Sequence, residues 1–457
     1  MFCPACGSRA EAGSEFCKLC GKSLRGKDAT LLAKTGAAPA PVHPQSVAGH
    51  GHVPTHLVQS LENRLRRLAG TERLEGFSLS DFFSEVFKRH TPEQMDEYFV
   101  TGTTRTTPRI EDIPTGWPKP WFFFRVLMFV VALYLLFDYV IIEFGASNAI
   151  PGLMVMGSLA IPLAVLVLLF ELNVLRDVSF VGVLALFSFG AITGFIFTEF
   201  VTGLVASSLS WMGNSVAGIV EEIAKLLAVC VIVGRRKHRF ILNGILFGGA
   251  VGAGFAAFES MGYAFGEFRD TFMIATANHI QTAISNTAGV TVRDILVFLQ
   301  TIIDDPNKLH PDADALSSMV RVIQLRGWLS PFGHVAWTAI AAAGLWRIKG
   351  ARDLEMRMFF NRQFLGIFMI PVTLHMIWDM PWISILSKFM NHPPDWPVYV
   401  LYTFLGLVSW FILMGLVQQG LRQIKDEQIV LTRSALAEAK PGTDSGGGEL
   451  APSSIPG

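Results

Sequence analysis

Long apolar runs alternate with short polar segments through the central and C-terminal parts of the chain. Each run holds about 18 to 25 residues, the length at which a helix crosses a hydrocarbon core of about 30 Å. The eight runs lie at residues 121–144, 149–170, 178–200, 216–233, 240–262, 328–346, 364–383 and 398–419. This pattern predicts an all-α polytopic membrane protein with about eight transmembrane helices.

The N-terminal twenty residues follow a different pattern, with two Cys-x-x-Cys pairs separated by ten residues. The pairs consist of Cys3, Cys6, Cys17 and Cys20. Four thiolates at this spacing can surround Zn²⁺ tetrahedrally and leave no open position. Two disulfides are the alternative, but no secretory signal precedes the pairs, so we expect a reduced, cytosolic segment. The spacing predicts a zinc ribbon with a structural or a docking role rather than a catalytic one, and a cytosolic protein would be the partner at such a docking site.

The remaining polar segments suggest a five-part organisation. Residues 27–56 are rich in Ala, Pro, Gly and His without periodicity, which is typical of a flexible linker. Leucines recur at helical spacing from Leu57 to Leu68. The predicted parts are a zinc ribbon at 1–26, a linker at 27–56, a cytosolic helical segment at 57–117, a membrane domain at 118–420, and a cytosolic helix end with a disordered tail at 421–457.

Composition and charge indicate which kinds of partner the chain can have. Hydrophobic residues make up 51% of the chain and charged residues 16%, against about 25% charged in a typical soluble domain. Lysine plus arginine equals aspartate plus glutamate at 37 each, so we expect no nucleic-acid partner. The composition points to a lipid bilayer as the environment of the chain.

Basic residues in the short loops predict the orientation. The loops on one side carry Arg176, Arg235, Arg236, Lys237, Arg239, Arg347, Lys349, Arg352, Arg357 and Arg362. The short loops on the other side carry only Lys388. By the positive-inside rule this asymmetry places both termini in the cytosol of a multi-pass protein of the cell (inner) membrane. The long outer segment 266–327 is expected to lie on the outer surface as a lid.

Several ionisable residues fall inside the apolar runs, where each is costly and therefore a candidate for function. Those that stand out are Glu221, Glu222, Lys225, Glu259, His334, His375 and Asp379. Lys225 lies on the same helical face as both Glu221 and Glu222 but can offset only one of them. The other must be protonated or paired with a group on another helix. A structural ion pair between spans is the alternative explanation.

The predicted depths of these residues converge. Counted from the outer ends of their runs at about 1.5 Å per residue, the acidic and histidine side chains lie within about 5 to 12 Å of the outer boundary. Such convergence from four helices predicts one water-accessible pocket. Carboxylates and two imidazoles, without an evident serine or cysteine nucleophile, favour activation of water. The same groups can bind a catalytic Zn²⁺, and the sequence does not choose between these two routes to hydrolysis.

Four motifs occur in order along these runs. They are Glu221-Glu222-x-x-Lys225, Phe255-x-x-x-Glu259, Ser330-Pro-x-Gly-His334 and His375-x-x-x-Asp379. Together they resemble the PrsW family of intramembrane proteases, over roughly Pro118 to Gln419. That family is similar to the CAAX prenyl endopeptidases and bacterial Abi-type membrane proteins, in which histidine stands at the position of Glu259 and asparagine at that of Asp379.

The resemblance implies a function and roles for the residues. Glu221 and Glu222 would activate water, and Glu259, His334, His375 and Asp379 would complete the pocket. The substrate would be a membrane-anchored protein cut near its extracytoplasmic juxtamembrane region, with the first cut of an anti-sigma factor as one case. A proton- or metal-coupled transporter and a non-catalytic membrane receptor are the competing interpretations.

Overall fold

The structure, a computed structural model, describes residues 74, 76–234, 238–286, 291–294, 296–297, 300, 313–390, 394 and 396–438. The chain divides into two units, Met1–Leu57 and Val58–Gly457, and every described residue belongs to the second. The predicted zinc ribbon with its four cysteines, the linker, the start of the cytosolic segment and the tail therefore lie outside the described residues.

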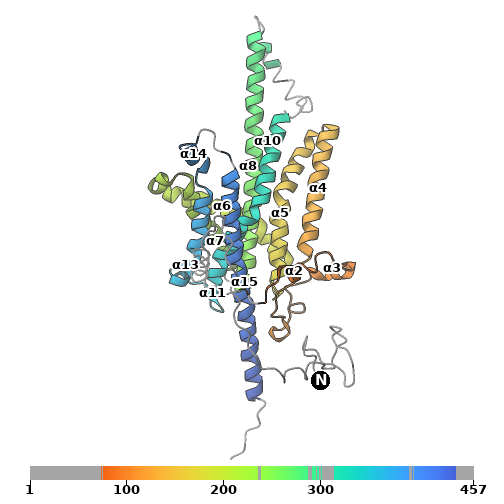
Figure 1. Cartoon of the computed structure of the whole chain (residues 1–457), viewed down its shortest axis with the longest axis vertical. Coiled ribbons are helices and arrows are strands. Elements are labelled where there is room, and N and C mark those ends of the chain that lie inside the picture. Colours follow the sequence, from red (N-terminus) through yellow and green to blue (C-terminus); the bar gives the residue numbers. More distant parts are fainter. Residues whose placement is uncertain are drawn as a thin grey trace, which may run out of the picture. The chain divides into compact units, whose positions relative to one another are not determined.

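The described part of the chain is helical and contains no strand (Figure 1). The principal helices are α4 (Phe122–Phe144), α5 (Ile150–Leu172), α6 (Phe180–Leu209), α7 (Ala217–Val233), α8 (Ile241–Asn286), α10 (Ala313–Leu329), α11 (His334–Lys349), α13 (Arg362–Trp378) and α15 (Trp396–Glu438). The short α-helices are α2 (Leu79–Phe82), α3 (Pro92–Tyr98), α12 (Met356–Phe359) and α14 (Trp382–Leu386). Four 3₁₀ turns, η1 (Ile110–Asp112), η2 (Ser147–Ala149), η3 (Ser210–Val216) and η5 (Ser330–Phe332), connect them.

Each of the eight predicted runs falls on a helix, and five of these helices are long and apolar enough to cross a membrane. The five stretches are Phe122–Phe144, Ser147–Leu172, Phe180–Val205, Ile241–Ile274 and Trp396–Leu436. The other three helices, α7, α11 and α13, have 17, 16 and 17 residues. At about 1.5 Å per residue they are about 24 to 26 Å long, shorter than a typical hydrocarbon core. The chain is therefore a multi-pass membrane protein, and eight crossings remain a prediction.

The predicted boundary after the fifth run and the predicted lid are wrong in part. Helix α8 continues past residue 262 to Asn286, and α10 packs against both α8 and α5. Hydropathy marks where a helix becomes polar, but a helix ends only where capping or a helix-breaking residue stops it. No proline interrupts residues 263–286, so α8 extends beyond its apolar portion.

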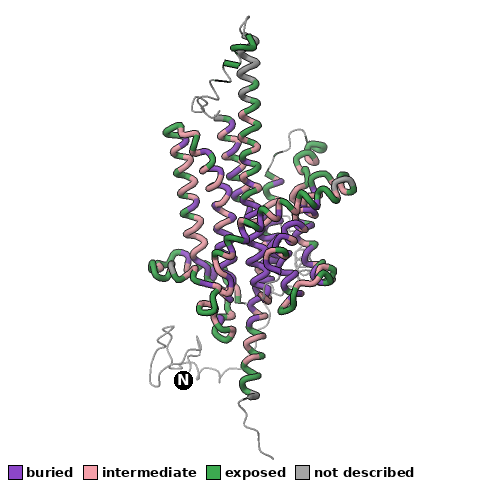
Figure 2. Tube along the Cα trace, turned by 180° about the vertical axis from the view of Figure 1, so that it is seen from behind, coloured by how far each residue is buried: buried purple, intermediate pink, exposed green. Residues whose placement is uncertain are grey.

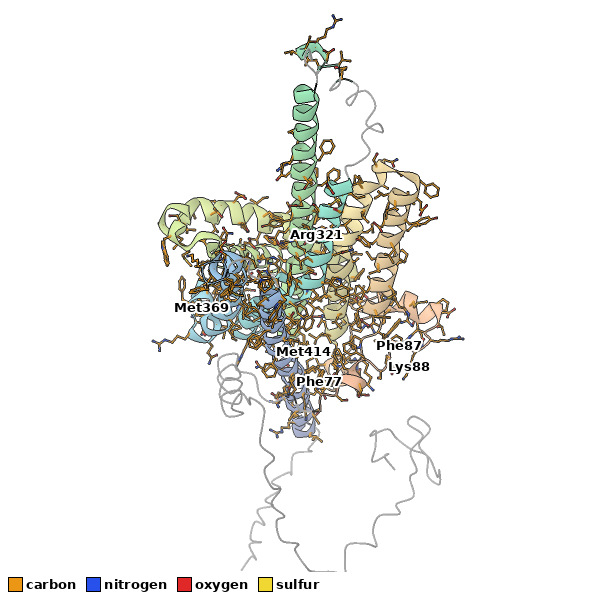
Figure 3. The ribbon with its side chains drawn as sticks, turned by 45° about the horizontal axis from the view of Figure 1, so that its top comes forward. Phe77, Phe87, Lys88, Arg321, Met369 and Met414 are labelled. Atoms are coloured by element: carbon orange, nitrogen blue, oxygen red, sulfur yellow. The ribbon has the colours of Figure 1, made fainter. Side chains whose placement is uncertain are left out.

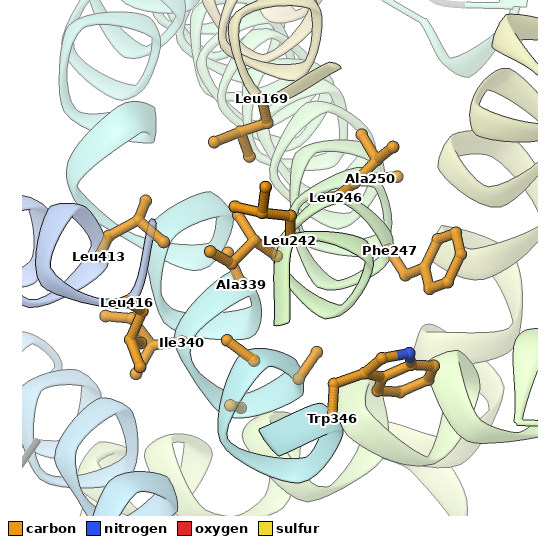
Figure 4. Close-up of a cluster of buried hydrophobic side chains, with 14 of the residues drawn as sticks. Leu169, Leu242, Leu246, Phe247, Ala250, Ala339, Ile340, Trp346, Leu413 and Leu416 are labelled. Atoms are coloured by element: carbon orange, nitrogen blue, oxygen red, sulfur yellow. The ribbon is translucent and has the colours of Figure 1, made fainter. Parts of the chain in front are cut away.

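Helices α8 and α11 form the centre of the fold. In the most apolar stretch of α8, 94% of the residues are buried, against 11% in α4, which lies at the periphery (Figure 2). Glycines of α8 allow this close packing, because a Cβ atom at Gly248 or Gly252 would lie 2.3 Å from a backbone oxygen of α11. Side chains from α5, α8, α11 and α15 fill the core beside them, among them Leu169, Leu246, Phe247, Ile340, Trp346 and Leu413 (Figure 4).

The described part of the predicted cytosolic segment packs against the membrane helices. The phenolic hydroxyl of Tyr98, in α3, donates a hydrogen bond to Glu171 of α5 at 2.8 Å. Gln428 of α15 donates to the backbone oxygens of Ile110 and Ile113 at 2.7 and 2.8 Å. Phe87 and Lys88 lie beside the start of α4 (Figure 3), where Phe87 contacts Phe124. The segment is therefore attached at both α4–α5 and α15.

Candidate active site

The structure brings all six sequence-predicted acidic and histidine residues together. Glu221 and Glu222 lie in the second turn of α7, and Glu259 lies midway along α8. His334 is the first residue of α11, directly after η5, and Asp379 caps the C-terminal end of α13, four residues after His375. The site is thus assembled where α7 and α11 begin and where α13 ends.

Lys225 is the buried cation of the site. Its ammonium group lies 2.6 Å from Glu222 Oε1, 3.4 Å from Glu221 Oε2 and 2.8 Å from His334 Nδ1. The side chains of Lys225 and Glu222 are completely buried, whereas Glu221 is 14% exposed. The closest ion pair therefore belongs to Glu222, and Glu221 is the more accessible of the two glutamates.

His375 is held on both of its ring nitrogens. Its Nδ1 lies 3.0 Å from Glu222 Oε1, and its Nε2 lies 3.1 Å from Asp379 Oδ2. The ring stacks on Trp337 with centroids 4.5 Å apart. The Nε2 atom also lies 3.8 Å from Glu221 Oε2. These contacts fix the imidazole so that one edge faces Glu221.

His334 is held in a similar way from another direction. Its Nε2 lies 2.8 Å from Glu259 Oε2, while its Nδ1 lies 3.8 Å from Glu221 Oε2. Glu259 also accepts a hydrogen bond from Arg326 Nη2 at 2.5 Å. The ring centroids of His334 and His375 lie 5.0 Å apart, and each ring has a nitrogen that faces Glu221.

Arg326 is a site residue that the sequence interpretation missed. It lies near the end of α10, in the predicted outer segment, and its Nε also donates to Ser260 at 3.2 Å. A charge is conspicuous only inside an apolar run, and Arg326 lies just before the sixth of these runs. A single charge next to the predicted outer end of a run is the one signal that could have identified it.

A cavity of about 370 Å³ adjoins these side chains. Its lining includes His334, Trp337, Arg326 and Asp379, together with the aromatic rings of Tyr263 and Tyr402. It therefore combines charged groups from the site with several aromatic rings. A cavity of this size has room for water and for part of a peptide segment next to His334.

Comparison with known protein families agrees with this geometry. The model of the PrsW family of intramembrane metalloproteases matches residues 178–413, just over half of the chain. The chain belongs to the PrsW family. No curated protein and no solved structure matches it. The resemblance to PrsW inferred from the four motifs is thus confirmed, and all six predicted site residues lie within the PrsW match.

A PrsW protein is described as a metalloprotease, and the donor atoms of this site fit a metal ion. Atoms of Glu221, His334 and His375 lie within 4.8 Å of one another. Tetrahedral Zn²⁺ needs ligand atoms about 3.4 Å apart, so a small contraction suffices. The second ring nitrogen of each histidine meets a carboxylate, as metal-ligating histidines usually do. Lys225 contacts the same Nδ1 of His334 that faces this centre, and Asp379 lies 3.1 Å from the same Nε2 of His375. Metal binding therefore requires both groups to move away from these nitrogens.

Proposed function

We propose that this chain is an intramembrane endopeptidase in which Glu221 activates the attacking water. One observation carries the proposal: Glu221 Oε2 lies 3.8 Å from a ring nitrogen of each histidine, and Glu221 is the more exposed of the two glutamates. The neighbouring Glu222 is fully buried and occupied by Lys225 and His375. Family membership supports peptide-bond hydrolysis as the reaction.

The geometry suggests a division of roles. Glu221 takes a proton from water, and the resulting hydroxide attacks the carbonyl carbon of the substrate. The same carboxyl group returns the proton to the amine as the C–N bond breaks, which leaves a carboxylate and an amine. Glu222 and Lys225 are positioning residues that fix α7 and His375. A metal ion held by Glu221, His334 and His375 would supply Lewis-acid polarisation and a more acidic water.

The two histidines need correct orientation for either route. Asp379 and Glu222 hold His375, and Glu259 holds His334, so that each ring directs one nitrogen toward Glu221. Without a metal, the N–H at His375 Nε2 is the ring donor available to the oxyanion that develops on the substrate carbonyl, because His334 Nδ1 accepts a hydrogen bond from the Lys225 ammonium group. We therefore assign catalytic roles to Glu221, His334 and His375, and positioning roles to Glu222, Glu259 and Asp379, which act through the two imidazoles.

The substrate that we propose is a membrane-anchored protein cut near its extracytoplasmic juxtamembrane region. The short loops opposite the basic side adjoin the start of α7 and the end of α13, where the site lies. With both termini in the cytosol, the site opens toward the outer face of the inner membrane. First-site cleavage of an anti-sigma factor and docking of a cytosolic protein at the zinc ribbon belong to this proposal, as does kinship with the CAAX and Abi-type proteins.

Cleavage of a panel of single-span membrane proteins by the purified full-length chain tests the proposal. The Glu221→Gln variant should cleave about 10²- to 10⁴-fold more slowly, since it loses the general base. Glu199→Gln is a matched control, because Glu199 is an exposed carboxylate on α6, and it should cleave at the wild-type rate. Unchanged cleavage by Glu221→Gln would refute its role, and ion flux in proteoliposomes without any cleavage would favour a transporter.

Metal content decides between the two routes to hydrolysis. The full-length chain with Cys3, Cys6, Cys17 and Cys20 all changed to serine lacks the predicted ribbon ligands and isolates the second site. If this variant retains one zinc per chain by mass spectrometry, and the additional His334→Ala change removes it, the site holds a metal. If it retains none yet still cleaves, Glu221 acts without a metal.

A further inference from the structure

A second cavity lies away from the active site, between the cytosolic segment and the first membrane helices. Its volume is about 710 Å³, and its lining includes His90, Gln94, Tyr98, Thr106, Trp121 and Arg176. All of these residues precede the range of the PrsW match, which begins at residue 178. The proposed protease mechanism makes no use of them, so the cavity needs an explanation of its own.

The cavity lies at the level where three candidate membrane helices begin or end. Helix α4 begins at Phe122, α5 ends at Leu172 and α6 begins at Phe180. Aromatic rings gather at this level: Tyr98 and Trp121 have centroids 5.0 Å apart, and Phe99 and Phe180 have centroids 4.4 Å apart. Tryptophan and tyrosine are enriched at membrane–water interfaces. The cavity is therefore placed at the depth of lipid headgroups.

Two arginines lack an acidic partner here: Arg176, which lines the cavity, and Arg125, which contacts the lining residues His90 and Trp121. No carboxylate of the described residues lies within 4 Å of the Arg176 guanidinium, whose Nη2 donates to the backbone oxygen of Tyr98 at 2.6 Å. Arg125 lies 4.4 Å from the Trp121 ring, and its Nη1 is buried without a hydrogen-bond partner in the described part of the chain. By contrast, the nearby Lys88 and Lys119 are paired with Glu85 and Asp81. The protein itself thus leaves the arginine charges uncompensated.

The remaining surroundings favour an anion. His90 stacks on Trp121 with ring centroids 3.6 Å apart, and both line the cavity. Arg125 contacts His90 Nδ1 at 3.0 Å, so its positive charge lies next to the lining without being part of it. The one carboxylate in the lining belongs to Glu97, which is exposed. Arg176 has a backbone φ of 48°, the only positive φ among the described non-glycine residues. A left-handed conformation is unfavourable for such a residue, and here it accompanies placement of the guanidinium at the cavity.

We propose that this cavity binds the phosphate group of an anionic membrane phospholipid. Guanidinium groups match phosphate oxygens with paired N–H donors and are weakly hydrated, so Arg176 in the lining suits this ligand better than a lysine would, and the charge of Arg125 behind His90 and Trp121 adds to the attraction. The side chains of Gln94 and Thr106 add polar contacts, and the rings of Tyr98 and Trp121 face the start of the acyl chains. A lipid is favoured over a soluble phosphate because three candidate spans end at the cavity.

Native mass spectrometry of the full-length chain in detergent tests this inference. We expect phosphatidylglycerol to be retained at least about tenfold more tightly than phosphatidylcholine with the same acyl chains, since loss of a charge-assisted contact commonly costs that much. The double variant Arg125→Gln/Arg176→Gln should lose this preference. Arg347→Gln is the matched control, because Arg347 is an exposed arginine at the predicted cytosolic end of α11, and it should keep the preference.

A second variant guards against misfolding of the double mutant. Val100 lines the cavity and is 57% exposed, so Val100→Trp should narrow the cavity without removing a cation. It should lose phosphatidylglycerol as the double variant does. Equal retention of both lipids by the wild type, or an equal loss in Arg347→Gln, overturns the inference. Displacement of the lipid by micromolar inorganic phosphate overturns the membrane source and assigns the cavity to a soluble phosphate.

Discussion

Two buried glutamates, Glu171 and Glu222, show how the two ends of this molecule differ. Glu171 accepts hydrogen bonds from the backbone N–H groups of Trp121, Phe122 and Phe123 at 2.7 to 2.9 Å, and from the hydroxyl of Tyr98. Both of its oxygens are occupied. In Glu222, Lys225 and His375 both contact Oε1. The other oxygen, Oε2, is buried without a hydrogen-bond partner among the described residues.

The difference separates a structural carboxylate from one in a site that carries chemistry. Glu171 supplies the hydrogen-bond acceptor that the first turn of α4 lacks within its own helix, so it fixes the start of that helix. A buried oxygen without a partner is costly and persists where function demands it. Both carboxylates are buried, so burial does not distinguish them. What distinguishes Glu171, which anchors the start of α4, from Glu222 in the active site is whether both oxygens have hydrogen-bond partners.

The largest effect should follow from removal of the charge on Lys225. The Lys225→Met variant leaves Glu222 buried without its closest cation, and breaking a buried ion pair commonly costs about 3 to 5 kcal/mol. The free energy of unfolding, measured by titration with dodecyl sulfate in detergent, should fall by that amount. Lys388→Met, at an exposed lysine, should leave it unchanged. A stability equal to that of the wild type would show that the pair is not formed.

A smaller loss of stability is expected when Glu171, which anchors the start of α4, is changed. The Glu171→Ala variant deprives three backbone N–H groups and Tyr98 of their acceptor, which should lower the free energy of unfolding by about 1 to 3 kcal/mol. Its cleavage rate per folded molecule should equal that of the wild type. Glu143→Ala, an exposed glutamate on α4, is the control. If Glu171→Ala loses cleavage while it remains folded, the contrast drawn between the two glutamates is wrong.

Changing Trp337, whose ring stacks on His375, should lower the free energy of unfolding by a smaller amount. The indole N–H of Trp337 donates to Ser409 of α15 at 3.0 Å, and the ring stacks on His375. Trp337→Phe keeps a ring but loses this hydrogen bond, so we expect a destabilisation of about 1 kcal/mol. Cleavage should slow severalfold because His375 becomes less well fixed. Ser409→Ala removes the same hydrogen bond without touching the ring, and an equal slowing there would locate the effect in the α11–α15 contact.

The smallest effect concerns Tyr98 at high pH. Burial, together with the nearby carboxylate of Glu171, raises the pKa of Tyr98 above its usual value. Above a pH of about 10 the unfolded chain loses this proton while the folded chain keeps it, so stability falls as pH rises. Tyr98→Phe should cost about 1 kcal/mol at neutral pH through loss of the hydrogen bond. Its stability should also fall less steeply between pH 10 and 11 than that of the wild type.

Much of this site is readable from the sequence, because charges in apolar runs are rare and conspicuous. The positions of Glu221, His334 and His375 were predicted from such charges and from their common depth. The role of Glu171 is not predictable from such charges, because Glu171 accepts hydrogen bonds from three backbone N–H groups about fifty residues earlier in the chain. The role of Arg326 is not predictable for a similar reason. Its contact with Glu259 depends on how α10 packs against α8, which no local sequence pattern specifies.

The fold shows the same division. Hydropathy located the long apolar helices within the described residues, but it did not predict α10, and it placed the end of α8 at residue 262 instead of Asn286. It also assigned full membrane-crossing length to α7, α11 and α13, which are 16 to 17 residues long. One end of each of these three helices lies at the active site, where α7 and α11 begin and α13 ends. The sequence therefore predicts the apolar interior of a helix better than its termini, where tertiary contacts decide.

The glycines of α8 have a consequence for how this molecule tolerates bilayers of different thickness. Gly248 and Gly252 bring the backbones of α8 and α11 into contact, so the separation of these two helices does not depend on flexible side chains. Glu259 and His334, which those helices carry, move together when the bilayer thins or thickens. The adjustment then falls on peripheral helices such as α4, which tilt within the lipid. The distance between Glu259 and His334 should accordingly be the same in short-chain and long-chain lipids.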